Sequence, residues 1–73
     1  MSQLGERVLR MFRDLRKDAL DLHVLFEAGG NEPEERTQVL DAIEELVRGG
    51  MLEGRGSDFY VLTAKGRRAL GHF

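Results

Sequence analysis

The chain has 73 residues and no cysteine, which allows one small domain and excludes disulfide bonds and thiolate metal sites. Its composition, 41% hydrophobic and 33% charged, is typical of a folded domain, and no apolar run approaches the ~20 residues of a transmembrane helix. The net charge of −2 is segregated, because residues 1–17 carry +3, residues 18–53 carry −8 and residues 54–73 carry +3.

The first predicted element is an amphipathic helical region within residues 1–28. Its apolar residues recur three or four positions apart, on one helical face, and they are Leu4, Val8, Met11, Phe12, Leu15, Ala19 and Leu22. The pattern allows one continuous helix or a break near Lys17 and Asp18, where Asp18 could cap a second helix. Charged residues interrupt the pattern near the N-terminus, unlike in a signal peptide, so we expect a cytoplasmic location.

The first part of this apolar stripe has two interpretations. It could form the seam of a homodimer or the core of a single chain, and both roles could hold together for Leu4, Val8, Met11, Phe12 and Leu15. A chain of this length gains only roughly 3–5 kcal/mol of net stability from its own core. Burial between two copies would add to this, so we predict a homodimer.

A second helix is predicted within residues 31–50. The glycine pair at 29–30 ends the preceding region, because glycine readily adopts the left-handed conformation that closes a helix. Asn31 is the expected N-cap, and Pro33 falls in the first turn. The expected buried face comprises Val39, Leu40, Ile43, Leu46 and Val47, and the other side comprises Glu34, Glu35, Gln38, Asp41, Ala42, Glu45 and Arg48. A second glycine pair, at 49–50, ends this helix.

The remaining residues predict a β-hairpin at 51–62 and a helix at 63–71. Residues 51–53 and 59–62 are the expected strands, and the intervening residues 54–58 are rich in turn formers. Thr63 is the expected N-cap of the last helix. Gly66 lies inside that helix, where glycine costs about 1 kcal/mol relative to alanine, so we expect it at a close contact with another segment.

Three segments together carry a resemblance to a known family. They are residues 40–46, the run Gly50-Met51-Leu52, and the run Tyr60-Val61-Leu62-Thr63-Ala64-Lys65-Gly66-Arg67. Over roughly residues 36–70, this order resembles the winged helix-turn-helix domain of MarR- and PadR-style transcriptional regulators. The resemblance implies a mainly α, α+β fold with about three helices, a two-stranded wing and a short C-terminal helix. It also implies that residues 31–50 hold the recognition helix, which enters the major groove of DNA.

The resemblance further implies a small DNA-binding protein that regulates transcription. The expected nucleic-acid-binding residues are Arg36, Thr37, Gln38, Asp41, Arg55, Lys65 and Arg67. Thr37, Gln38 and Asp41 would contact base edges, and the arginines and the lysine would contact phosphates of double-stranded DNA.

The charge of the expected recognition helix supports a different partner. Glu34, Glu35, Asp41 and Glu45 lie on its expected exposed side, and carboxylates repel the phosphates that dominate affinity for DNA. The alternative function is a protein–protein interaction module that docks a basic partner on this helix and does not bind DNA. A third interpretation, a helical dimer whose wing is purely structural, also stays open.

The sequence offers no catalytic or metal-binding constellation. Only His23 and His72 could contribute imidazole, and His23 with Asp21 and Glu27 is a poor ligand set in a chain without cysteine. The two serines lie in a terminus and a turn, without a recognisable base. We therefore expect no enzyme activity, no metal and no cofactor.

Overall fold

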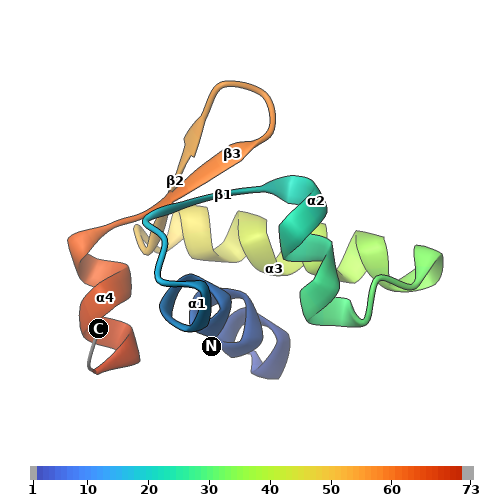
Figure 1. Cartoon of the computed structure of the whole chain (residues 1–73), viewed down its shortest axis with the longest axis horizontal. Coiled ribbons are helices and arrows are strands. Elements are labelled where there is room, and N and C mark those ends of the chain that lie inside the picture. The colour runs from blue at the N-terminus through green and yellow to red at the C-terminus, as the bar shows by residue number, and fades with distance from the viewer. Residues whose placement is uncertain (1, 72–73) are drawn as a thin grey trace.

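The chain combines helices with a small antiparallel sheet (Figure 1). The computed structural model describes residues 2–71, with the order α1 (Gln3–Leu15), β1 (Ala19–Asp21), α2 (Leu22–Leu25), η1 (Phe26–Gly29), η2 (Pro33–Glu35), α3 (Arg36–Arg48), β2 (Leu52–Arg55), β3 (Phe59–Leu62) and α4 (Ala64–Leu70). Within these residues there are four α-helices and one sheet of strand order β1-β3-β2, so the predicted α+β class is confirmed and a third strand joins the expected two. None of the described helices is long and apolar enough to cross a bilayer.

Helix α1 ends where the sequence allowed a break. Its start is capped by Ser2, whose hydroxyl accepts a hydrogen bond from the backbone N–H of Gly5 at 3.0 Å. At its other end Arg16 adopts the left-handed conformation, with φ 55°, and the N–H of Lys17 donates to the carbonyl of Phe12 at 3.0 Å. The interpretation of residues 4–28 as one continuous helix is therefore wrong.

Strand β1 occupies residues for which the sequence predicted helix. Its three residues pair antiparallel with β3. Before β1, the carbonyl of Asp18 accepts from the N–H of Leu62 at 2.8 Å. After β1, the N–H of Leu22 donates to the carbonyl of Asp58 at 2.8 Å. A strand this short shows no alternating pattern of its own, so pairing with a distant segment overrides the local helical spacing.

Helix α2 begins at a cap that differs from the expected one. The carboxylate of Asp21 accepts from the N–H of Val24 at 2.9 Å. Asp18, the expected cap, lies before β1 and accepts a hydrogen bond from Arg67 of α4 instead. A single turn of α2 continues into η1, which ends as predicted at the glycine pair, with Gly30 left-handed at φ 77°.

Helix α3 begins later than predicted. Asn31 has φ 61° and caps no helix, so the expected N-cap is wrong. Proline disfavours helical backbone at the residue before it, and Glu32, which precedes Pro33, is extended with ψ 135°. The chain therefore cannot pass from Asn31 directly into a helix. The short turn η2 forms first, and α3 starts at Arg36.

The end of α3 and the hairpin follow the prediction. Gly50 is left-handed at φ 79°, and the N–H of Met51 donates to the carbonyl of Leu46 at 2.9 Å, which closes the helix. Strands β2 and β3 then pair antiparallel, starting with Leu52 opposite Leu62. In Figure 1 this hairpin projects away from the helices. The predicted hairpin within residues 51–62 is confirmed.

The core lies between α1, α3 and the sheet. Its largest fully buried side chains come from all of these layers and from α2, and they are Phe12, Leu9, Leu25, Ile43, Leu52, Val8 and Val39. Gly5 of α1 and Ala42 of α3 are also buried and line one small hollow where the two helices pack together. The expectation that Ala42 lies on the exposed side is therefore wrong.

Two residues expected in the buried face of α3 lie at the surface. Leu40 is 40% exposed and Val47 is 37% exposed. On a helix of 3.6 residues per turn, Ala42 and Leu40 flank the buried line of Val39 and Ile43 on opposite sides. Because α1 packs on the Ala42 flank, the flank of Leu40 and Val47 is turned outward.

Helix α4 has the predicted cap and the predicted close contact. The hydroxyl of Thr63 accepts from the N–H of Gly66 at 3.1 Å and donates to the carbonyl of Gly50 at 2.6 Å. A Cβ added at Gly66 would lie 2.6 Å from Cδ1 of Leu62 and would overlap the carbonyl of Met51. Glycine is therefore required where α4 crosses the start of the hairpin.

We predict that Gly66→Ala lowers the free energy of unfolding by about 1–3 kcal/mol, because the added methyl group meets backbone that cannot move aside cheaply. Urea denaturation followed by circular dichroism measures this. Gly54→Ala is the matched control, since a Cβ there meets no atom closer than 3.8 Å. Equal stability of the two variants would contradict the contact at Gly66.

Candidate functional site

The exposed side of α3 combines apolar and acidic residues. Leu40 and Val47 are seven positions apart, which is close to two helical turns, so they lie on one side of the helix with Glu44 between them. Asp41 follows on the adjacent side, and all four are exposed. We call Leu40, Asp41, Glu44 and Val47 the α3 face. Leu40 and Val47 keep 40% and 37% of their surface exposed, so this face is only partly covered.

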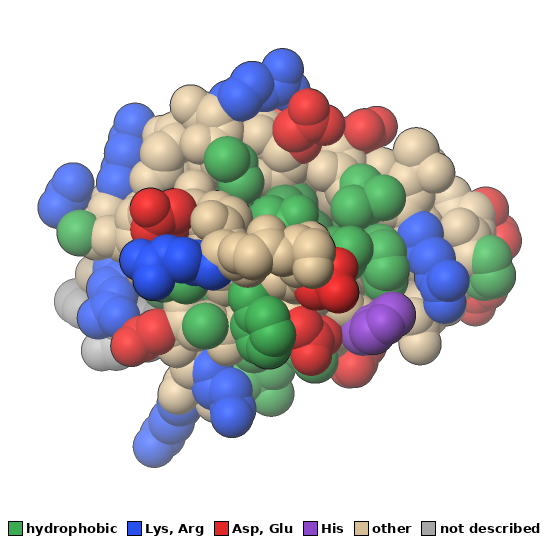
Figure 2. Space-filling view, turned by 90° about the horizontal axis from the view of Figure 1, so that it is seen from above, with side chains coloured by type: hydrophobic (Ala, Val, Ile, Leu, Met, Phe, Trp, Pro, Cys, Tyr) green, Lys and Arg blue, Asp and Glu red, His purple; other side chains and the backbone are tan. Residues whose placement is uncertain are grey.

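Apolar side chains reach the surface on the hairpin side of the molecule. Figure 2, which looks down on that side, shows hydrophobic side chains open to solvent among acidic and basic groups. Besides Leu40 and Val47, Phe59 of β3 is 52% exposed. Single exposed apolar residues are ordinary on protein surfaces. Two of them aligned along one helix form a stripe that a partner can cover in one contact.

The carboxylates on α3 have no cationic partner. Among the described residues, the ion pairs join Arg10 to Glu6, Arg13 to Asp14, Arg55 to Glu53 and Arg67 to Asp18. None of these pairs involves Asp41, Glu44 or Glu45. Like charges three or four positions apart on a helix repel each other by roughly 0.2–0.5 kcal/mol per pair. Arg48, four positions after Glu44, and Arg36, four positions before Leu40, are also exposed on this side of α3, so charges of both signs lie beside the α3 face although none of them forms an ion pair with a described residue.

The residues predicted to bind nucleic acid are not gathered on one surface. Thr37, Gln38 and Asp41 are exposed near the start of α3, but Gln38 lines a hollow with residues of α1. Lys65 and Arg67 belong to α4, which Figure 1 places at the other end of the molecule from the start of α3.

The two predicted phosphate-binding arginines outside α4 already have contacts within the chain. The guanidinium of Arg36 lies 5.3 Å from the centroid of the Phe26 ring, a cation–π geometry. Arg55 on the hairpin is 3.1 Å from the carboxylate of Glu53. Arg55 is therefore paired with a carboxylate, whereas Arg36 keeps a positive charge that its contact with Phe26 does not neutralise.

The predicted dimer seam divides between core and surface. Val8 and Phe12 are fully buried within the chain, Leu4 and Met11 pack partly against the core, and Leu15 is 48% exposed. The chain exposes 4728 Å², close to the about 4,600 Å² expected for a compact monomer of 8.3 kDa. The core function of this stripe therefore accounts for Val8 and Phe12, and dimerisation stays a prediction that rests on the other three.

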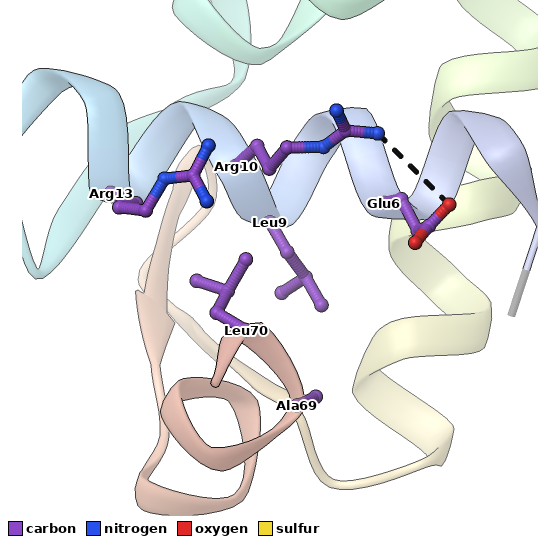
Figure 3. A pocket seen from close by; sticks show the side chains of 6 residues that line it. All are labelled: Glu6, Leu9, Arg10, Arg13, Ala69 and Leu70. Atoms are coloured by element: carbon purple, nitrogen blue, oxygen red, sulfur yellow. Dashed lines mark ion pairs between the residues drawn. The ribbon is translucent and has the colours of Figure 1, made fainter. Parts of the chain in front are cut away.

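A small hollow of about 160 Å³ lies between α1 and α4 (Figure 3). Leu9 and Leu70 point into it, and Arg10 and Arg13 lie along its edge on α1. Arg10 is 4.0 Å from the carboxylate of Glu6, in an exposed pair. Among the described residues that line the hollow, the titratable groups are one carboxylate and two guanidinium groups, and these do not form a nucleophile with its base.

The ring of His23 packs against an aromatic neighbour. Its centroid lies 6.4 Å from that of Phe26, with the rings tilted by 57°. Within residues 2–71, no three His, Asp or Glu side chains are grouped closely enough to hold a metal ion. The imagined set of His23, Asp21 and Glu27 is therefore not assembled.

Comparison of the chain with models of protein families, with curated proteins and with solved structures found no match. The chemistry of the surface is consequently the basis for assigning a function. On that basis the α3 face is the candidate functional site, because it aligns two exposed apolar residues along one helix beside exposed charged residues.

The sequence missed the apolar half of this site. Val39-Leu40 and Leu46-Val47 are adjacent apolar pairs, and a helix on one flat core buries only one member of such a pair completely. Ala42 could have indicated which side of the helix is covered, because a small side chain allows another helix to pack closely on that side. The acidic half of the site was visible from composition alone.

We predict that Leu40→Gln together with Val47→Gln changes the free energy of unfolding by about 1 kcal/mol or less, because both side chains are already exposed. Ile43→Ala, one position from the same stripe but 1% exposed, is expected to lose roughly 3 kcal/mol. Urea denaturation compares them. A loss of similar size in both variants would show that Leu40 and Val47 serve folding and not a partner.

Proposed function

We propose that this chain is a winged-helix domain that binds another protein through the α3 face. Three features support the winged-helix part. Helix α1, strand β1 and then the helical segments α2, η1, η2 and α3 precede the hairpin in the chain. The first strand pairs with the second strand of the hairpin, so the sheet order is β1-β3-β2. The hairpin projects beyond the helices, as a wing would (Figure 1).

The exposure of Leu40 and Val47 is the observation that favours a protein partner over DNA. Transfer of apolar surface out of water is favourable, at roughly 25 cal/mol per Å², and a protein interface can provide that burial. The phosphate backbone of DNA provides little apolar surface and is repelled by Asp41 and Glu44. A face with an apolar centre and carboxylates beside it therefore fits a protein better than a duplex.

A DNA-binding regulator is the second candidate. The observation in its favour is the first part of α3, where Thr37 and Gln38 are exposed and could reach base edges. Against this candidate, carboxylates near Thr37 and Gln38 would repel the phosphates of DNA, and they include Glu34, Asp41 and Glu45. Removing that charge separates the two candidates.

We expect the unmodified chain to show no salt-sensitive binding to a labelled random duplex of about 30 base pairs, measured by fluorescence anisotropy at low salt. Glu34→Lys with Asp41→Lys is expected to create such binding if repulsion is the obstacle. The matched control, Glu6→Lys with Asp14→Lys, makes the same charge change on α1. Tight, salt-sensitive binding by the unmodified chain would instead favour the DNA-binding candidate.

The direct test is a photo-crosslinking amino acid, benzoylphenylalanine, placed in the full chain at Leu40 and, as a control, at Arg68 of α4. In the organism that encodes the chain, we expect a discrete protein adduct from position 40 that nuclease treatment leaves intact. The exposed control position is expected to give no discrete adduct. An adduct at position 40 that disappears with nuclease would overturn the assignment to a protein partner.

A further inference from the structure

We propose that two copies of this chain pair through the free edge of β2, so that their sheets join into one. This surface differs from the α3 face and from the predicted dimer seam on α1, and the proposal goes beyond the proposed function. It is argued from the unused hydrogen-bonding groups of β2, from the charge pattern along that strand and from the exposure of the hairpin.

Strand β2 lies at an edge of the sheet. In the order β1-β3-β2 it has β3 on one side and, within the described residues, no strand on the other. Its backbone groups form no hydrogen bond with a described residue other than those with β3. Alternate residues of an edge strand point their N–H and C=O groups away from the sheet, where another strand can bind them. Glu53, Gly54 and Arg55 are exposed on the projecting hairpin (Figure 1), so this edge is accessible.

The charges along β2 match those of a second β2 that runs antiparallel to it. When two copies pair about Gly54, Glu53 of each copy lies directly opposite Arg55 of the other. Residues opposite one another in an antiparallel pair project to the same face of the sheet, so both contacts between the copies join opposite charges. A register centred on Glu53 or on Arg55 would place like charges opposite each other. Pairing about Gly54 is two-fold symmetric, so both copies contribute the same strand.

The charges already present on the hairpin are compatible with this pairing. Glu53 and Arg55 of one chain are 3.1 Å apart, but both side chains are more than half exposed, and an exposed pair of this kind contributes little to stability. In the paired strands each of these charges has a second opposite charge beside it. Asp58, the remaining charged residue of the hairpin, adjoins β3, and its carbonyl accepts from the N–H of Leu22 on the side away from the free edge.

The other edge of the sheet does not offer such a match. Strand β1 has only the three residues Ala19–Asp21. Pairing β1 with itself about Leu20 would place Asp21 opposite Ala19, which carries no charge. Strand β2 is therefore the edge that fits a second copy.

The first test is the oligomeric state of the full chain. Pairing two strands of four residues buries little apolar surface, so the expected dimer is weak and reversible. Sedimentation velocity between about 10 μM and about 1 mM measures it, and we expect a dissociation constant on the order of 100 μM. A chain that stays monomeric throughout this range would overturn the proposal.

Charge-exchange variants identify the strand. Glu53→Arg and Arg55→Glu each place like charges opposite one another, so each is expected to weaken self-association at least about tenfold. An equal mixture of the two restores opposite charges in both contacts, and its dimer is expected within about threefold of the unmodified affinity.

Glu6→Arg and Arg10→Glu make the same charge changes at an exposed pair on α1. These control variants are expected to stay within about twofold of the unmodified affinity. A mixture of the β2 variants that does not associate, or an equal loss in the α1 controls, would overturn the proposal.

A single introduced cysteine tests the register. The chain has no cysteine, and the proposed pairing places the two copies of Gly54 opposite each other. Their Cα atoms would be about 4.5–5.5 Å apart, within the range that a disulfide spans. A Cβ at Gly54 meets no atom closer than 3.8 Å. We expect Gly54→Cys, oxidised with copper phenanthroline, to give a disulfide-linked dimer on non-reducing electrophoresis.

Ser57→Cys is the matched control, because it is exposed in the turn of the same hairpin but lies away from the two-fold axis. It is expected to give at least about tenfold less linked dimer than Gly54→Cys. Equal yields from the two positions would overturn the register.

The pairing and the proposed function fail separately. Leu40→Gln with Val47→Gln is expected to leave self-association unchanged, because neither residue lies on β2. A dimer abolished by that variant would show that copies meet through the α3 face, and it would overturn pairing through β2. Crosslinking from position 40 tests the protein-binding function whether or not the dimer forms.

Discussion

The packing of α1 against α3 determines where the other elements can lie. Gly5 and Ala42 are buried at this contact, and Val8 and Phe12 meet the buried side of α3 near Val39 and its neighbours. This contact fixes the rotation of α3 about its own axis. Because α1 occupies the flank of Ala42, the flank of Leu40 and Val47 is only partly covered. The candidate site is thus a consequence of how the core closes.

Local chemistry made part of the fold predictable. The glycines at 30 and 50 adopt the left-handed conformation expected of helix stops, and Thr63 caps α4 as its side chain suggests. These features depend on a few neighbouring residues, so the sequence displays them directly. The hairpin belongs to the same group, because its turn formers and its aromatic and β-branched strand are adjacent in the chain.

Other parts of the fold depend on distant contacts and left no local signal. Helix α1 ends at Arg16 in the left-handed conformation, for which most chains use glycine, so a stop based on glycine could not be seen there. Strand β1 exists because β3 offers it hydrogen bonds, and its own residues are compatible with a helix. For the candidate site, composition revealed the acidic charge, whereas only the position of α1 revealed which apolar residues stay exposed.

The hairpin contacts the helical part of the molecule at both ends of β3. The N–H of Leu22, at the start of α2, donates to the carbonyl of Asp58 beside the hairpin turn, and the carbonyl of Asp18 holds the N–H of Leu62 at the other end of β3. Strand β1 therefore connects α2 to the hairpin through pairing with β3 and through hydrogen bonds at both ends of β3. Asp21, the last residue of β1, also caps the first turn of α2. The same three-residue strand thus pairs with the hairpin along β3 and supplies the cap of α2, so a change in either contact alters the support of the other.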